Sequence, residues 1–116
     1  MLRHLAGRLR RGGGRVLISV PNASSYQASI FDEDWIGWDI PRHLWHFSRE
    51  TLMRIVAEAG LRVHQCFTVE LKPFAAASAA RSARAQQKRR AYAPGRISVL
   101  EAADAGSEIV LVAGRE

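Results

Sequence analysis

The sequence predicts an α/β protein in which helices cover one small sheet. Short, almost continuous aliphatic stretches of strand length occur at 15–20 and 108–113, as in strands inside a layered sheet. Between them, residues 48–59 carry apolar side chains at helical spacing. The alternation of helix and strand within 116 residues is typical of a single α/β domain and leaves no length for a second one.

The first two elements are a helix and a strand. Residues 2–11 carry leucines at helical spacing, and a run of three glycines at 12–14 then ends the predicted helix. RVLISV at 15–20 follows. Its unbroken aliphatic character predicts a strand buried on both faces of a mainly parallel sheet. Pro21 ends that strand because proline cannot donate a ladder hydrogen bond.

The middle of the chain predicts two helices. Residues 23–31 form a short one, with Ser24 or Ser25 as its N-cap. A longer helix begins at Ser48 and ends at Gly60, a residue suited to the left-handed conformation of a C-terminal cap. Its apolar stripe consists of Leu52, Ile55, Val56 and Ala59, and Phe47 is placed to contact Leu52 across the N-cap.

The last third predicts strands around a weak helix. Residues 61–69 read as a strand, with Val63 and Phe67 among its inward side chains. The Ala- and Arg-rich stretch 74–91 predicts one helix with a poor apolar face, which Pro94-Gly95 ends. Residues 97–100 predict a short companion to the final strand, 108–113.

Charge and composition limit the partners. The net charge is +6, and the basic residues fall in two blocks without acids, 1–15 and 71–100. Such blocks bind phosphate groups or form solvated faces. Aromatic residues do not alternate with the basic ones, as they do in single-strand binders. A nucleic-acid partner is therefore not the favoured interpretation, but a non-catalytic module that binds RNA or another anion stays open as an alternative function.

Several classes of protein are disfavoured. No apolar run is long enough to span a bilayer, and the basic N-terminus lacks the apolar core of a secretory signal. We therefore expect a cytoplasmic protein without membrane contact. One cysteine, Cys66, excludes an internal disulfide. The two short pairs of potential ligands, His43 with His46 and His64 with Cys66, lack the spacing of a zinc site, so we expect no metal.

WIGWDIPRHLWHF, residues 35–47, contains the candidate catalytic residue. His43 is the candidate general base, since a histidine titrates near neutrality. Asp39 and Arg42 are candidate substrate-binding residues, and Arg42 is suited to holding a carboxylate or phosphate of a substrate. The alternative is structural: Asp39 pairs with Arg42 or orients His43 and so fixes the loop. The sequence leaves both interpretations open.

The remaining candidate substrate-binding residues each have a structural alternative. Trp35 and Trp38, together with Trp45, are suited to stacking on a ring or to anchoring a long loop by buried area. His46 is the less favoured of the two histidines because its position beside a helix cap suggests packing. Asn22 follows a predicted strand, where α/β sheets place ligand contacts, but it is also a good turn residue.

Two stretches together resemble a known family. LAGRLRRGGGRVLISVPN and WIGWDIPRHLWHFSRETLMRIVAEAGL are similar to the second half of class I S-adenosylmethionine-dependent methyltransferases, over about residues 2–70. The resemblance implies a Rossmann-like sheet of seven strands whose last strand is inserted antiparallel. It would make 15–20 the fifth strand, 61–69 the sixth and 108–113 the seventh, with flanking helices.

The resemblance also predicts what is missing. In this family the first half of the domain holds the cofactor with a glycine-rich loop that follows a strand, whereas Gly12–Gly14 precedes one and so is not a dinucleotide fingerprint. We expect no cofactor-binding residues in this chain, and S-adenosylmethionine only in the complete enzyme. The chain is interpreted as an inactive C-terminal half, whose methyl acceptor is unidentified.

This interpretation sets the expected organisation and partners. One partial domain, 1–116, is divided into a helix and buried strand (1–22), a Trp/His-rich substrate-side loop (23–47), a helix and strand (48–70), a basic insertion (71–96) and the terminal strand (97–116). A separately encoded N-terminal half would complete the sheet. Otherwise we expect homo-association through an exposed sheet edge, because unpaired strands associate.

Overall fold

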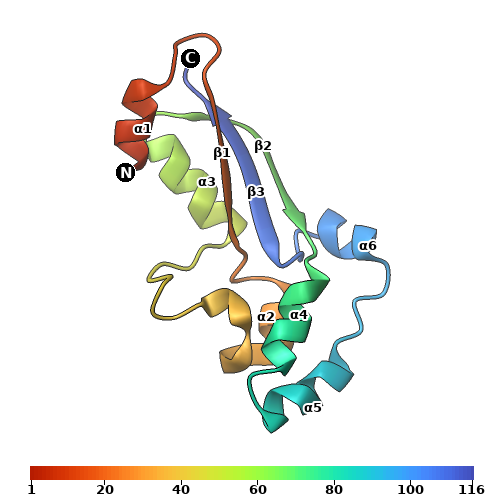
Figure 1. The fold of residues 1–116 in the computed structure, drawn as a ribbon. Coiled ribbons are helices and arrows are strands. Elements are labelled where there is room, and N and C mark those ends of the chain that lie inside the picture. Colours follow the sequence, from red (N-terminus) through yellow and green to blue (C-terminus); the bar gives the residue numbers. More distant parts are fainter.

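The computed structural model describes all residues, 1–116, and has three strands and six α-helices. Strands β1 (Arg15–Pro21) and β2 (Arg62–Val69) flank β3 (Glu108–Gly114) in the order β1-β3-β2. The last strand therefore lies in the centre and runs antiparallel to both neighbours. A sheet of mainly parallel neighbours was the wrong prediction, although β1 and β2 do run in the same direction (Figure 1).

Helices α1 (Leu2–Arg8) and α3 (Arg49–Glu58) pack on the sheet and form the first core. This core contains the alternate side chains Ile109, Leu111 and Ala113 of the central strand β3, together with Leu52 and Val56 of α3. As predicted, Ser48 caps α3: its Oγ accepts a hydrogen bond from the Thr51 amide, and the Thr51 hydroxyl accepts one from the Ser48 amide. Gly60 ends the turn after α3 with a φ of +84°.

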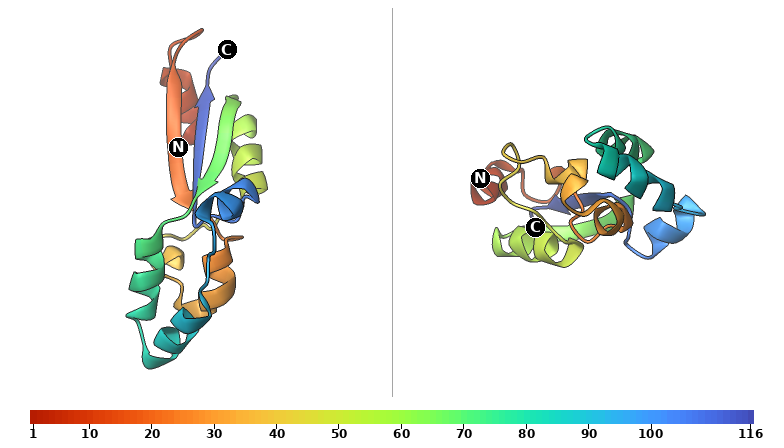
Figure 2. Two further views of the ribbon diagram at one scale, coloured as in Figure 1. Left: turned by 90° about the vertical axis from the view of Figure 1, so that its right-hand side faces the viewer. Right: turned by 90° about the horizontal axis from the view of Figure 1, so that it is seen from below.

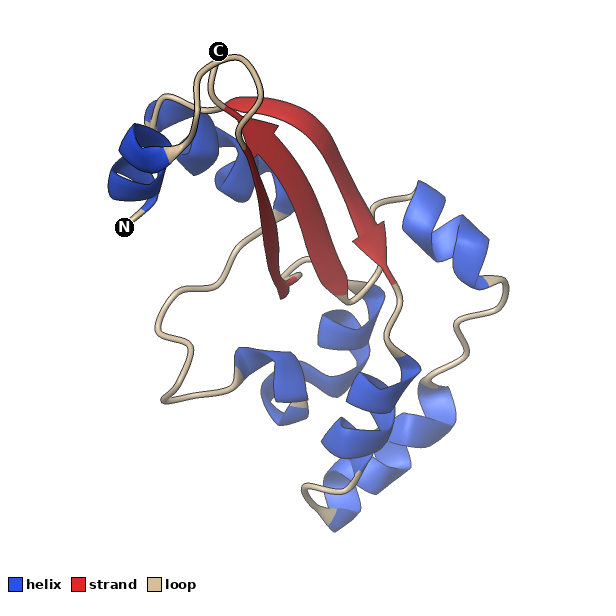
Figure 3. Cartoon of the chain, turned by 45° about the horizontal axis from the view of Figure 1, so that its top comes forward, coloured by secondary structure: helices blue, strands red, loops and turns tan.

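The other face of the sheet carries exposed apolar side chains. Leu17 is 66% exposed and Phe67 is 43% exposed, so β1 is not buried on both faces as its sequence predicted. A continuous aliphatic run shows that a strand has two apolar faces, but not whether anything covers the second one. In Figure 3 no helix passes in front of the three strands, so this face of the sheet is seen directly.

Phe67 was expected to point inward, and a β-bulge explains why it does not. The pairing of β2 with β3 shifts between Val63 and Gln65, so that two residues of β2 face one of β3. Because side chains alternate along a strand, one extra residue exchanges the two faces beyond it. Cys66 therefore packs toward the first core, Thr68 is buried, and Phe67 faces outward.

A second, helical core lies beyond the carboxyl ends of β1 and β2 (Figure 2). It is built from α2 (Tyr26–Phe31), the short 3₁₀ turns η1 (Asp32–Asp34) and η2 (Ile36–Trp38), α4 (Lys72–Ala79) and α5 (Ala83–Ala91). Its buried side chains are Ala28, Phe31, Trp35, Ala75, Ala79 and Tyr92. The molecule is therefore elongated, with a longest dimension of 50 Å.

Three further predictions about elements need correction. The single helix predicted at 74–91 is two helices, because Ser82 turns the chain and caps α5 through a hydrogen bond from the Ala85 amide. Residues 97–100, predicted as a strand, begin the helix α6 (Ile97–Ala102). There the Glu101 carboxylate accepts the Glu70 amide at 2.9 Å and ties α6 to the end of β2. The strand preference of Ile97 and Val99 depends on context and does not decide their conformation. Helix α1 ends at Arg8 rather than 11.

Candidate functional site

The segment 23–47 starts and ends at the carboxyl end of β1. Asn22 and Phe47 form an isolated parallel bridge, in which the Ala23 amide donates to the Phe47 carbonyl at 2.9 Å. The loop therefore leaves and re-enters the sheet at the same place and lies at the end where β1 and β2 finish (Figure 1). In open α/β sheets this end is where ligands bind.

Asp39, Arg42 and His43 form one cluster. Asp39 lies at the end of η2 and has a left-handed φ of 42°. The chain turns after it, and the His43 amide donates to the Asp39 carbonyl at 2.9 Å. Its Oδ1 accepts hydrogen bonds from Arg42 Nε at 2.9 Å and lies 2.6 Å from Arg42 Nη2. Its Oδ2 lies 3.0 Å from His43 Nδ1. The structure thus joins the three residues that the sequence singled out.

This arrangement leaves one nitrogen of His43 available. A carboxylate at Nδ1 favours the tautomer with the proton on that nitrogen, so that Nε2 presents a lone pair. The His43 side chain is 48% exposed. It lines a cavity of about 200 Å³ together with Pro21, Ile36, Gly37, Asp39, Arg42 and Phe74. The geometry is that of an oriented base at the wall of a small cavity.

The tryptophans have different environments. Trp35 is 1% exposed and lies in the second core, where its Nε1 donates to Gln27 Oε1 at 3.2 Å. Trp38 meets the Trp35 ring edge-on at 5.1 Å and donates to the Asp32 carbonyl. Trp45 is 78% exposed. Trp35 and Trp38 therefore anchor the loop, whereas Trp45 does not.

His46 and Asn22 are both held by protein groups. His46 Nε2 donates to the Trp38 carbonyl at 2.8 Å, and its ring meets Trp38 edge-on. Asn22 is fully buried: Nδ2 donates to the carbonyls of Asp104 and Gly106, and Oδ1 accepts from the Ser24 amide. These contacts are those of packing and turn residues.

Sequence reasoning missed a buried polar network that joins the two cores. Glu70, at the end of β2, accepts hydrogen bonds from Gln27 Nε2 and from the Tyr92 hydroxyl, the latter at 2.6 Å. Its second oxygen accepts the Ser107 amide at 3.1 Å. The signal in the sequence was weak: a single acid directly before the acid-free basic block.

This network predicts that the stability of the fold depends on pH through the hydroxyl of Tyr92. The pKa of Tyr92 is raised above its usual range. Burial is the largest cause, followed by the hydrogen bond to Glu70 and by the negative charge of Glu70. The folded protein therefore holds this proton more tightly than the unfolded chain. Stability from this group is complete below the unfolded pKa of about 10 and is lost as pH rises above it.

We expect the free energy of unfolding to fall above pH 10, by less than about 1.4 kcal/mol per pH unit, the limit for one proton. Urea unfolding at a series of pH values measures this slope. The Tyr92→Phe variant, although less stable at pH 8, should show a smaller alkaline slope. Equal slopes in both proteins would contradict the assignment.

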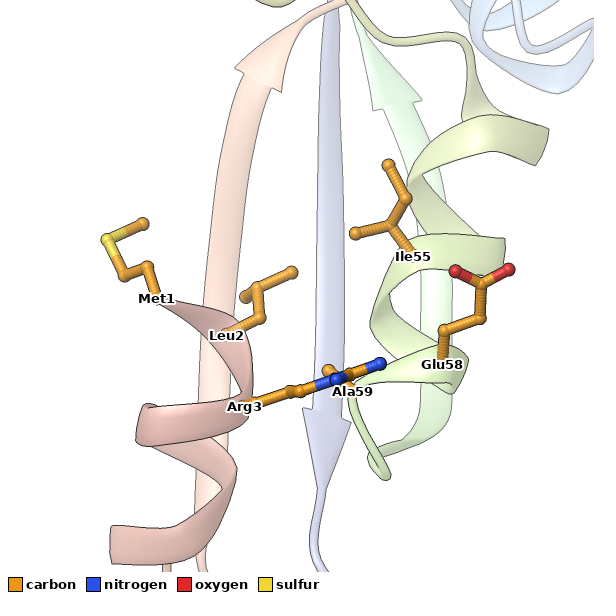
Figure 4. Close-up of a pocket in the computed structure, with 6 residues that line it drawn as sticks. All are labelled: Met1, Leu2, Arg3, Ile55, Glu58 and Ala59. Atoms are coloured by element: carbon orange, nitrogen blue, oxygen red, sulfur yellow. The ribbon is translucent and has the colours of Figure 1, made fainter.

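The largest cavity is elsewhere and lacks this chemistry. It measures about 390 Å³ and lies between α1 and α3 (Figure 4). Arg3 reaches toward α3 across an otherwise mostly apolar lining, and Glu58 also pairs with Arg54. No group of three or more His, Cys, Asp or Glu side chains is placed to hold a metal ion, and no helix is both long and apolar enough to cross a membrane.

Residues 1–66 match the family described as methyltransferase domain, which is more than half of the chain. No curated protein matches. The match includes α1, β1, the Asp39–Arg42–His43 cluster and α3, and extends into β2.

Methyltransferases in general use S-adenosylmethionine. The polar side chains at the carboxyl ends of β1 and β2, Asn22 and Glu70, are both hydrogen-bonded to protein partners. The left-handed Gly12 lies before β1, at the opposite end of that strand, with open space around it. By its family match, this chain belongs to the methyltransferase-domain family.

Proposed function

We propose that the chain is the C-terminal part of an S-adenosylmethionine-dependent methyltransferase, with β1, β2 and β3 as its fifth, sixth and seventh strands. One observation carries this proposal. The strand that is last in sequence lies between the other two and runs antiparallel to both, which is the arrangement that the family resemblance implies for the last strand. A chain that simply added strands in order would not produce it.

The rest of the sheet would continue from β1. That strand pairs only with β3, so its outer edge carries free amides and carbonyls. The exposed Leu17 lies on the same strand. We propose that a cofactor-binding half, from the same or another polypeptide, pairs along this edge. Without that half, the chain would bind no cofactor and would be free to associate with itself through the same edge.

Residues 35–47 would form a wall of the acceptor site. Ile40, Leu44 and Trp45 are large apolar side chains that are more than 70% exposed, close in sequence to the His43 cluster. A buried acceptor would cover such side chains. Trp35, Trp38, His46 and Asn22 hold this wall in shape, and Arg42 adds a positive charge at its surface.

His43 would act as the base. Its Nε2 accepts the proton of an acceptor hydroxyl or amine as the methyl group is transferred to that oxygen or nitrogen, and Asp39 stabilises the imidazolium that forms. Methyl transfer itself needs mainly correct positioning of the two reactants. The acceptor's identity depends on the walls that the other half supplies.

Cofactor binding tests the proposal. Equilibrium dialysis with labelled S-adenosylmethionine should show no binding to the chain of residues 1–116. The protein translated from the same reading frame extended upstream should bind it and release S-adenosylhomocysteine when an acceptor is present. Binding to the 116-residue chain alone, or an extended protein that lacks both a glycine-rich loop and binding, would overturn the proposal.

The alternative function, an anion-binding half-domain, has a different signature. Arg81, Arg89 and Arg90 take part in none of the ion pairs of the structure. If they bind RNA, affinity must fall steeply with added salt. A monomeric chain with salt-dependent RNA affinity would favour this alternative over the methyltransferase half.

A further inference from the structure

A second cavity is lined mostly by residues of the segment 23–47. It measures about 340 Å³, within the usual size of small-molecule sites. Trp35, Trp38 and Ile40 supply its apolar lining. Asp39 lines both cavities, but His43 and Arg42 line only the first. Arg81, which comes from the turn between α4 and α5, also lines the cavity.

The charges in this cavity are not balanced. Two carboxylates line it, and each is already paired: Glu33 lies 2.7 Å from Arg84, and Asp39 binds Arg42 and His43. Arg81 forms no ion pair and no side-chain hydrogen bond. The cavity therefore presents an unoccupied guanidinium beside aromatic and aliphatic surface.

We propose that this cavity binds a ring compound that bears one carboxylate. The ring would lie against Trp38 and Ile40, and the carboxylate would accept two parallel hydrogen bonds from the Arg81 guanidinium. Ile40 is 72% exposed, so an apolar ligand would remove a large side chain from water. Arg81 also belongs to the basic segment 71–96, to which the proposed methyl transfer assigns no role.

The charge balance selects a carboxylate over a phosphate. One guanidinium provides a single positive charge and one planar fork, which match a monoanionic carboxylate. A phosphate dianion would leave one of its two charges without a partner, because Arg81 is the only arginine or lysine in the lining and the carboxylates of Glu33 and Asp39 are already paired. The apolar lining likewise favours a ligand whose remaining surface is uncharged.

The chain as it stands provides the test. It contains three tryptophans, so a ¹⁵N correlation spectrum has three indole N–H signals. Titration with 2-naphthoate should shift the signals of Trp35 and Trp38, which line the cavity, and leave that of the exposed Trp45 unchanged. The matched neutral probe, 2-naphthamide, should bind at least about 10-fold more weakly, since it cannot form a charge-assisted pair.

Three arginine variants test whether Arg81 supplies the charge that binds the ligand. Arg81→Gln should weaken 2-naphthoate binding by about 10-fold or more and leave 2-naphthamide binding unchanged, and Arg81→Lys should fall between Gln and wild type. Arg90→Gln removes the same charge from an exposed, unpaired arginine that lines no cavity. Equal losses in both Gln variants, or equal affinity for the two probes, would overturn the proposal. Neither outcome bears on S-adenosylmethionine binding, which is measured separately.

Discussion

The Trp35→Ala variant is expected to lose about 3–5 kcal/mol of unfolding free energy. Trp35 is fully buried between α2 and α4, and Gly37 lies against its ring with no room for a Cβ. Alanine would leave a cavity at this point and would also remove the donor to Gln27 Oε1. Because Gln27 binds Glu70, the loss would extend to the link between the two cores.

The matched control lies ten residues away in the same segment. Trp45 is 78% exposed, so Trp45→Ala should change the unfolding free energy by no more than about 0.5 kcal/mol. Trp35→Phe keeps most of the buried area but loses the hydrogen bond, and should fall between the two. Urea unfolding measures all three variants, and amide hydrogen exchange should report the loss in α2 before the sheet. Similar losses for Trp35→Ala and Trp45→Ala would show that Trp35 is not the anchor.

The His43→Ala variant is expected to lower kcat of the complete, cofactor-binding enzyme by about 10²- to 10⁴-fold, the usual contribution of a general base. The histidine at position 43 is the only one whose Nδ1 pairs with a carboxylate at 3.0 Å while its ring lines a cavity. His4→Ala, on the exposed face of α1, is the matched control and should leave kcat unchanged. A full rate in His43→Ala would eliminate this residue as the base.

Asp39 is expected to act as a positioning residue through His43. In the 116-residue chain, long-range ¹H–¹⁵N spectra should show neutral His43 with its proton on Nδ1, and Asp39→Asn should shift that proton toward Nε2, because an amide can donate where the carboxylate accepted. In the complete enzyme the same variant should alter the pH profile of kcat and not only KM. An unchanged tautomer would contradict this role.

The local signals in the sequence were reliable where a residue acts on its own backbone neighbourhood. Ser48 was identified as a cap and Gly60 as the end of α3, because both depend on hydrogen bonds and φ values within a few residues. The prediction of a single helix at 74–91 was wrong, although the signal that divides this stretch is also local. The Ser82 cap that splits it is as short a pattern as that of Ser48, but it stands in an Ala-rich stretch without an apolar stripe to set the helix boundaries.

Among the site residues, the Asp39–Arg42–His43 cluster was foreseeable because its members are three and four residues apart, within the reach of one turn. Which nitrogen of His43 is engaged was not foreseeable, and neither was the environment of Trp35. Arg81 was outside the candidate set altogether, because 42 residues separate it from Asp39 and only the packing of α4 against η2 brings the two to one cavity.

The sequence by itself determined the three strands of the sheet, the cap of α3, the family and the cluster around Asp39, since each depends on periodicity or on short-range spacing. The tertiary structure decided the rest. It placed β3 between β1 and β2, left the Leu17 face open, moved Phe67 outward through a bulge and buried Glu70 among Gln27, Tyr92 and Ser107. These features depend on contacts between residues far apart in the chain, whose free energy comes from shared burial and not from any local pattern.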